Sequence, residues 1–98
     1  MKTIVLTHAK TCMGKPGYRA EAKDVPGEWR TGVTVHEAVG ELIRCIYEEL
    51  GFTDRDLQVS LGHHWEEMEN VELYQLLVWE RRLLTIEGLP EKREVRKK

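Results

Sequence analysis

Histidines are the first residues whose chemistry could define a site. His63 and His64 could ligate a metal ion, with His8, His36 and Cys12 as further ligands. Adjacent residues on a strand or helix point in different directions, and no set of His, Glu and Cys residues at i, i+4 spacing is large enough to complete a site. We therefore interpret the pair as solvated loop residues and predict neither a metal centre nor another cofactor.

Carboxylates and cysteines are the other candidates for catalysis. A nuclease of the ribonuclease H type needs several convergent carboxylates to hold two divalent ions. Near the predicted strands the chain offers Glu21, Asp24 and Glu28, and the first predicted strand has none. Cys12 and Cys45 have no adjacent histidine to activate them, and we interpret Cys45 as a small, partly buried filler of a helix. The sequence predicts that the protein is not an enzyme.

Length and composition bound the remaining possibilities. The 98 residues suffice for one domain, and 41% hydrophobic with 33% charged residues is typical of globular proteins. No signal peptide or membrane span is recognised, and two cysteines fit a cytoplasmic protein. The net charge is -2, but residues 91–98 hold five basic and two acidic side chains, which leaves ten basic and fifteen acidic before them. That basic tail is either solvated and disordered or a weak contact for phosphate or an acidic partner.

The first third of the chain reads as three strands. Residues 3–10 are β-branched and apolar, and residues 11–17 form a loop. Small or aromatic side chains alternate with charged ones over 18–22. Trp29, Thr31 and Val33 then alternate with Glu28, Arg30 and Gly32. Between them, Pro26 presets one central turn position and Gly27 supplies the positive φ of a type II turn. We predict an antiparallel meander of three strands.

A helix is predicted over residues 34–50. Thr34 and Glu37 have the spacing of an N-cap and its capping-box glutamate, an apolar stripe follows at helical spacing, and Gly51 is placed to end the helix. Residues 57–61 alternate and predict a fourth strand. Residues 65–86 favour a helix, broken or beginning near Asn70, although the segment from Leu73 to Trp79 could instead be a buried strand.

The spacing of nine residues resembles the HicB family of antitoxins. They are Gly17, Tyr18, Asp24, Pro26, Gly27, Gly32, Thr34, Glu37 and Ala38, within a likeness that covers Ile4 to Leu50. The resemblance implies a β-β-β-α-β domain with a degraded ribonuclease H-like fold. It also implies a non-catalytic protein that binds and blocks a small, basic, HicA-like toxin that cleaves RNA.

The last third of the chain departs from that family. Many members carry a C-terminal DNA-binding segment, but Glu66, Glu67, Glu69 and Glu72 would repel phosphate here, so operator binding stays open.

Three aromatic residues of the last third, Trp65, Tyr74 and Trp79, are a candidate interface, with Arg81 and Arg82 as its polar rim. The three aromatic residues have three alternative roles: they pack onto their own domain, they form the interface of a homodimer or higher homo-oligomer, or they bind another protein.

We thus expect an α+β protein, with an antiparallel β-β-β-α-β sheet and one packed helix in residues 1–62. Residues 63–90 would form a helical packing or oligomerisation segment, and 91–98 the basic tail. The expected function is that of a HicB-like antitoxin; the alternative is an orphan, homo-oligomeric structural or regulatory protein without a toxin.

Overall fold

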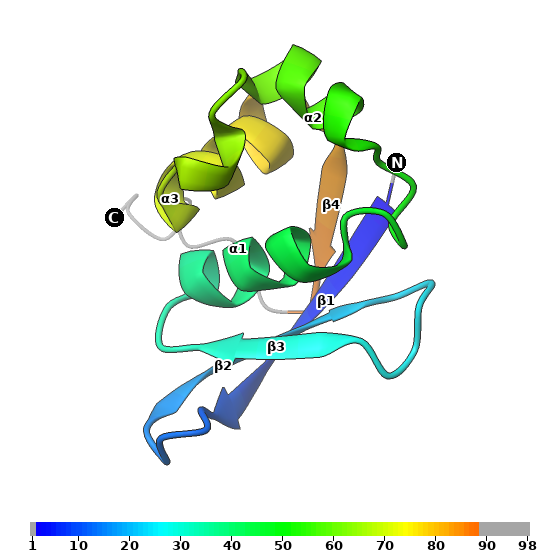
Figure 1. Ribbon diagram of the computed structural model, residues 1–98. Helices are drawn as coiled ribbons and strands as arrows, with labels where there is room; N and C mark the ends of the chain where they lie inside the picture. Colours follow the sequence, from blue (N-terminus) through cyan, green and yellow to red (C-terminus); the bar gives the residue numbers. More distant parts are fainter. Residues whose placement is uncertain (1, 89–98) are drawn as a thin grey trace, which may run out of the picture.

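A computed structural model describes residues 2–88, which form a four-stranded sheet with helices on one side (Figure 1). The elements in chain order are β1 (Lys2–Lys10), β2 (Pro16–Ala22), β3 (Trp29–Gly32), α1 (Val35–Ile46), α2 (Asp54–Leu61), η1 (Trp65–Glu67), α3 (Asn70–Tyr74), η2 (Gln75–Glu80) and β4 (Leu84–Glu87). The predicted α+β class is confirmed. The predicted tail, residues 91–98, lies outside the described residues.

The sheet has the order β3-β2-β1-β4. β1 pairs antiparallel with β2, with Ile4 opposite Ala22, and β2 pairs antiparallel with β3, with Tyr18 opposite Gly32. The predicted meander is therefore confirmed. β4 pairs with β1 in the parallel direction, so the sheet is mixed, and the expectation of an antiparallel sheet is wrong at its fourth strand.

Residues 57–61, predicted as the fourth strand, belong to helix α2. Thr53 begins this helix with a complete capping box: its hydroxyl accepts from the Asp56 amide at 3.0 Å, and the Asp56 carboxylate accepts from the Thr53 amide at 2.9 Å. Leu57 is buried, whereas Val59 is 76% exposed. The apparent alternation of "LQVSL" is therefore the amphipathic pattern of a short helix.

The fourth strand lies instead at Leu84–Glu87, within the stretch expected to be helical. A parallel neighbour of β1 needs a long crossover, and the helices between β3 and β4 supply it. Residues 63–88 thus contribute both helices and a strand to the same fold as residues 2–62.

The helix expected to begin near Asn70 is present as α3 and η2. Its second part is a π-helix, in which the Arg81 amide donates to the Leu76 carbonyl at 2.8 Å, five residues back. The alternative of a buried strand over 73–79 is therefore wrong. Within the segment, Leu73, Tyr74 and Leu77 are buried.

Helix α1 begins as its sequence predicts. The Thr34 hydroxyl accepts from the Glu37 amide at 3.1 Å, and the Glu37 carboxylate accepts from the Val33 amide at 2.8 Å, one residue before its expected partner. The regular helix ends at Ile46, earlier than expected, and turns continue to Gly51, whose φ of 97° is left-handed.

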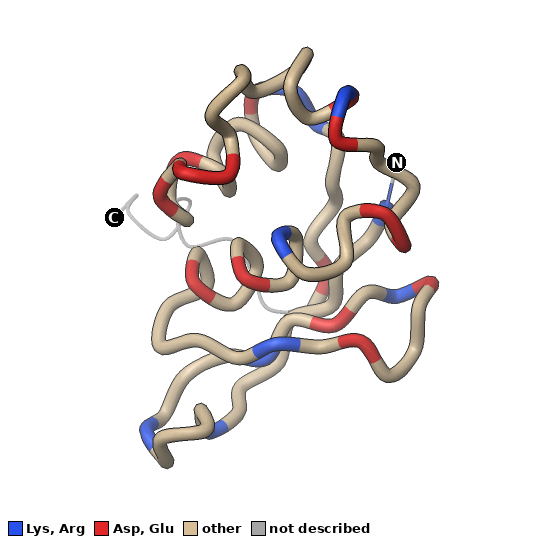
Figure 2. Tube along the Cα trace, in the orientation of Figure 1, with Lys and Arg blue, Asp and Glu red and all other residues tan. Residues whose placement is uncertain are grey.

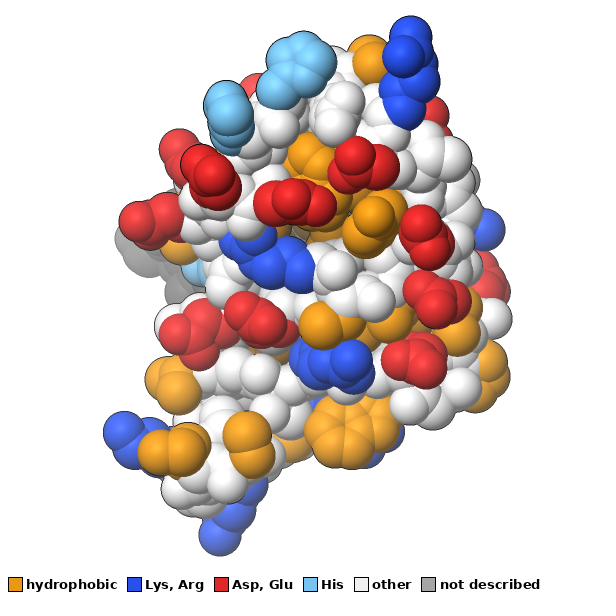
Figure 3. Space-filling model, in the orientation of Figure 1, with side chains coloured by type: hydrophobic (Ala, Val, Ile, Leu, Met, Phe, Trp, Pro, Cys, Tyr) orange, Lys and Arg blue, Asp and Glu red, His pale blue; other side chains and the backbone are white. Residues whose placement is uncertain are grey.

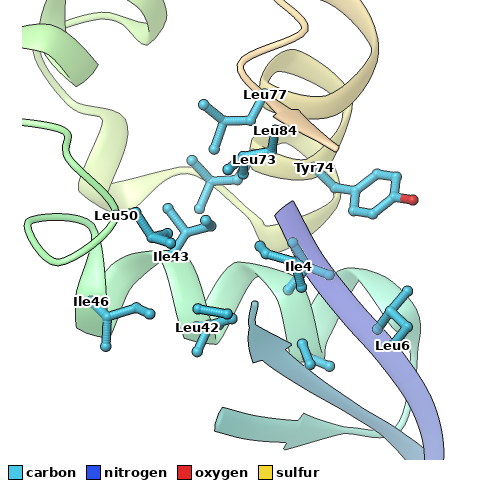
Figure 4. Packing of buried hydrophobic residues seen from close by; sticks show 14 of the residues in the cluster. Ile4, Leu6, Leu42, Ile43, Ile46, Leu50, Leu73, Tyr74, Leu77 and Leu84 are labelled. Carbon is cyan, nitrogen blue, oxygen red and sulfur yellow. The ribbon is translucent and has the colours of Figure 1, made fainter. Parts of the chain in front are cut away.

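The core lies between one face of the sheet and the helices (Figure 4). Ile4 and Leu6 of β1 face α1, while Leu73 and Leu77 close the core from above. The buried strand residues all share this face. The other face of the strands carries residues such as Thr7, Arg19 and Trp29, which are partly or fully exposed.

Candidate protein-binding surfaces

The signature glycines make close backbone packing possible. A Cβ on Gly17 would lie 2.4 Å from the Gly32 carbonyl oxygen, and one on Gly32 would lie 2.5 Å from the Glu37 Cβ. Only hydrogen fits at these positions, so β2, β3 and the start of α1 approach one another closely. Ala38 is fully buried at the same junction.

The other signature residues shape the β2–β3 turn and the strand before it. The Glu28 amide donates to the Val25 carbonyl at 3.2 Å, and Gly27 has a φ of 92°, as predicted for a type II turn around Pro26 and Gly27. Asp24 is exposed in this turn. Tyr18 packs its ring 5.3 Å from that of His8. The signature is thus part of the architecture, and it does not by itself define a binding surface.

Two of the three candidate aromatic residues are buried in the core. Trp65 is 2% exposed, donates from its indole nitrogen to the Asp54 carboxylate at 3.1 Å, and packs edge-on against Tyr47. Tyr74 is 3% exposed and lies between His36 and Trp79 at 4.9 and 5.4 Å. They pack onto their own domain, so their assignment to an interface is wrong.

The remaining candidates lie at the edge of the same region. Trp79 is half-buried. Arg81 and Arg82 are exposed, and Arg81 donates from Nε to the Ser60 carbonyl at 3.3 Å, which ties α2 to the end of η2. Arg82 adopts a φ of 55° where the chain turns toward β4. These arginines are accessible at one corner of the fold.

The residues with potential chemistry are dispersed. Within residues 2–88, no group of three or more His, Cys, Asp or Glu side chains could hold a metal ion. His63 and His64 are exposed, as expected. Both cysteines are free, and Cys45 is exposed, so its expected role as a small, partly buried filler of the helix is wrong. In the same described range, the helices are all too short or too polar to cross a membrane.

The helical layer, residues 35–80, is strongly acidic. It contains eleven Asp and Glu residues against two Lys and Arg residues, and all eleven acidic residues are exposed. Figure 2 marks the positions of Asp and Glu residues in red along the helices, and Figure 3 shows acidic side chains over the helical part of one face. Like charges on one surface produce a negative potential that extends into solvent.

Two local features accompany this negative potential. Desolvation raises the pKa of the Tyr47 phenol, and the nearby carboxylates of Glu48, Asp54 and Glu66 raise it further. Arg44, one of the two cations of the layer, is occupied internally: it donates to the Asn70 side chain at 3.0 Å and to the Glu66 and Met68 carbonyls.

The first three strands and their turns carry the opposite charge. Residues 2–34 contain six Lys and Arg residues against three Asp and Glu residues. On this part, Trp29 is 43% exposed, and the Arg19 guanidinium lies 4.6 Å from the centre of its ring. Arg19 also pairs with Glu21 at 3.2 Å. The domain thus has an acidic helical layer and a mildly basic sheet.

Sequence reasoning missed this separation of charge. The sequence shows an excess of acidic over basic residues before residue 91. Only a count of charges over the predicted helices would have assigned that excess to one layer. No family model, curated protein or solved structure matches the chain.

Proposed function

We propose that the protein is a non-catalytic antitoxin of the HicB type, which binds a small, basic, RNA-cleaving protein and blocks it. The observation that carries the proposal is the acidic helical layer, with eleven exposed carboxylates against two cations. RNA-binding surfaces are basic because they neutralise phosphates. A surface that presents many carboxylates competes with RNA for such a site.

The element order supports the proposal. Three antiparallel strands, a helix and a fourth strand follow one another in the order that the HicB resemblance implies, with α2, η1, α3 and η2 inserted before β4. The proposal includes a cytoplasmic location, where the exposed thiols of Cys12 and Cys45 stay reduced.

A charge-reversal experiment tests the proposal. The partner is a short basic protein encoded beside this one, and co-expression should restore growth and yield a co-purified complex. Glu48→Lys with Glu67→Lys reverses two exposed charges of the helical layer, and Asp24→Lys with Glu28→Lys makes the same change of charge on the β2–β3 turn.

The two variants should separate clearly. The helical variant should bind the partner at least tenfold more weakly, equivalent to about 1.4 kcal/mol, while the turn variant changes little. Equal effects of both variants would show that the helical layer is not the binding surface. A basic neighbour that neither binds nor is inhibited would refute the antitoxin function.

A second candidate function is that of a homo-oligomeric regulatory or structural protein without a toxin. It is favoured by the free outer edge of β3, at one side of the sheet.

A further inference from the structure

The outer edge of β3 has free backbone groups. The Ala22 amide donates to the Glu28 carbonyl at 3.3 Å, so this pair is hydrogen-bonded, and alternation along the antiparallel ladder directs the backbone groups of Arg30 toward β2. The backbone groups of Trp29 and Thr31 point away from β2, at the open edge of the sheet. Arg30 Nη1 donates to the Trp29 carbonyl at 2.6 Å, and among residues 2–88 the outward groups of Thr31 meet no partner.

A groove of about 780 Å³ follows this edge. Trp29, Arg30 and Thr31 line it along β3, Glu41 lines it from α1, and Lys10 from the end of β1. Arg30 and Glu41 carry opposite charges, and within the described part of the chain neither forms an ion pair. A groove that holds both signs is self-complementary when a two-fold axis passes between the two charges, because each charge then faces its opposite on the other copy.

We propose that β3 pairs antiparallel with β3 of a second copy of the chain, with Thr31 on the two-fold axis. Centring the pair on Arg30 would set two guanidinium groups directly opposite each other, which is unfavourable. Centring it on Thr31 sets Arg30 opposite Gly32 and brings Trp29 beside Val33 of the other copy, which follows the last residue of β3 and whose amide stays bonded to Glu37. Trp29 and Val33 are 43% and 49% exposed, and an aromatic residue opposite a β-branched one is a favourable cross-strand pair.

This pairing goes beyond the proposed function and does not rest on it. The pairing joins two four-stranded sheets into one. It also covers an edge strand that could otherwise pair with other chains and cause aggregation. The interface between the two copies is then formed by residues of β3. The sequence had suggested an interface at Trp65 and Tyr74, but both side chains are buried within their own domain.

Disulfide trapping tests the register. In a background with Cys12→Ser and Cys45→Ser, Thr31→Cys places two thiols on a hydrogen-bonded antiparallel pair, whose Cα atoms lie about 5.5 Å apart and so within disulfide reach. The matched control is Val59→Cys on α2, which is more exposed and remote from β3. Mild oxidation should convert Thr31→Cys to a covalent dimer and leave Val59→Cys monomeric. Equal cross-linking of the two variants would overturn the proposal.

Solution measurements test the pairing without new cysteines. Light scattering should show a dimer of the unmodified chain, Arg30→Glu should weaken it at least tenfold, and Arg30→Glu with Glu41→Arg should restore it. Circular dichroism checks that each variant is folded. A monomer at every attainable concentration would overturn the proposal. So would a monomer that binds a Glu–Val repeat peptide at β3, because the edge would then fit an acidic partner instead of a second copy.

Discussion

Replacing Arg44 tests how the helical layer is held together. Arg44 projects from α1 and donates hydrogen bonds to three groups on the segment between η1 and α3: the Glu66 carbonyl, the Met68 carbonyl and the Asn70 side chain. Arg44→Met keeps the length of the side chain and removes all of these donors. The acidic segment that follows Trp65 should then lose its main polar attachment to α1.

The size of the effect follows from the three acceptors. Hydrogen bonds from a charged donor contribute about 1.5–3 kcal/mol each, and we take about 1 kcal/mol for each because the freed groups regain contact with water. The free energy of unfolding should therefore fall by about 3 kcal/mol. For a domain of this size, the melting temperature should fall by roughly 12–24 °C.

Urea unfolding, followed by tryptophan fluorescence, to which buried Trp65 contributes, measures this loss. The matched control is Arg55→Met, which removes the other cation of the helical layer from an exposed position in the first turn of α2. That control should change the free energy of unfolding by less than about 0.5 kcal/mol. A loss of under about 1 kcal/mol for Arg44→Met, or an equal loss for Arg55→Met, would refute the argument.

Three further predictions concern packing and pH. Gly32→Ala should lower the free energy of unfolding by more than about 2 kcal/mol, because its Cβ would lie 2.6 Å from the Ala38 amide nitrogen and force α1 off the sheet. Hydrogen bonds from Thr53 lower the pKa of Asp56, so the stability lost in Asp56→Asn should be largest at neutral pH and shrink as the pH falls below about 3.9. Desolvation and nearby carboxylates raise the pKa of Tyr47, so the native protein should lose stability above about pH 10 that Tyr47→Phe retains.

Each of these predictions has a control in the same chain. Gly27→Ala meets open space and should cost only the penalty of a left-handed residue, about 1 kcal/mol, so a cost equal to that of Gly32→Ala would contradict the steric argument. Asp24→Asn and Tyr18→Phe remove the same groups at other positions. If they reproduced the pH profiles of Asp56→Asn and Tyr47→Phe, the assignments would be wrong.

The first half of the fold could be predicted because its signals are local. Each of three signals depends on only a few neighbouring residues, and the structure contains all three. They are the alternation over 18–22, the turn at Pro26 and Gly27, and the N-cap at Thr34. The close approach at Gly32 is a tertiary consequence of the same segment.

The second half was harder because its signals compete. Leu57 and Leu61 are spaced for a helix, but with Val59 they also alternate as in a strand, and the capping box at Thr53 was the signal that could have decided between them. β4 has only four residues and is defined by its pairing with β1, which no local pattern reveals.

The burial of Trp65 and Tyr74 could not be predicted for a different reason. The types of Trp65 and Tyr74 suit an interface as well as a core, and only the packing of α1, α2 and α3 shows that both side chains are enclosed. The charge separation between the layers was readable in principle, since it needs only the assignment of residues to helices and strands.

Inhibition of RNA cleavage is the most direct test of the proposed function. The measurement is the rate at which the basic partner cleaves RNA as the chain is added in increasing amounts. We predict that the native chain and the Asp24→Lys/Glu28→Lys variant stop cleavage at equal stoichiometry, while Glu48→Lys/Glu67→Lys fails to do so. Cleavage that continues at full rate with the native chain, or that all three proteins stop equally, would contradict the account.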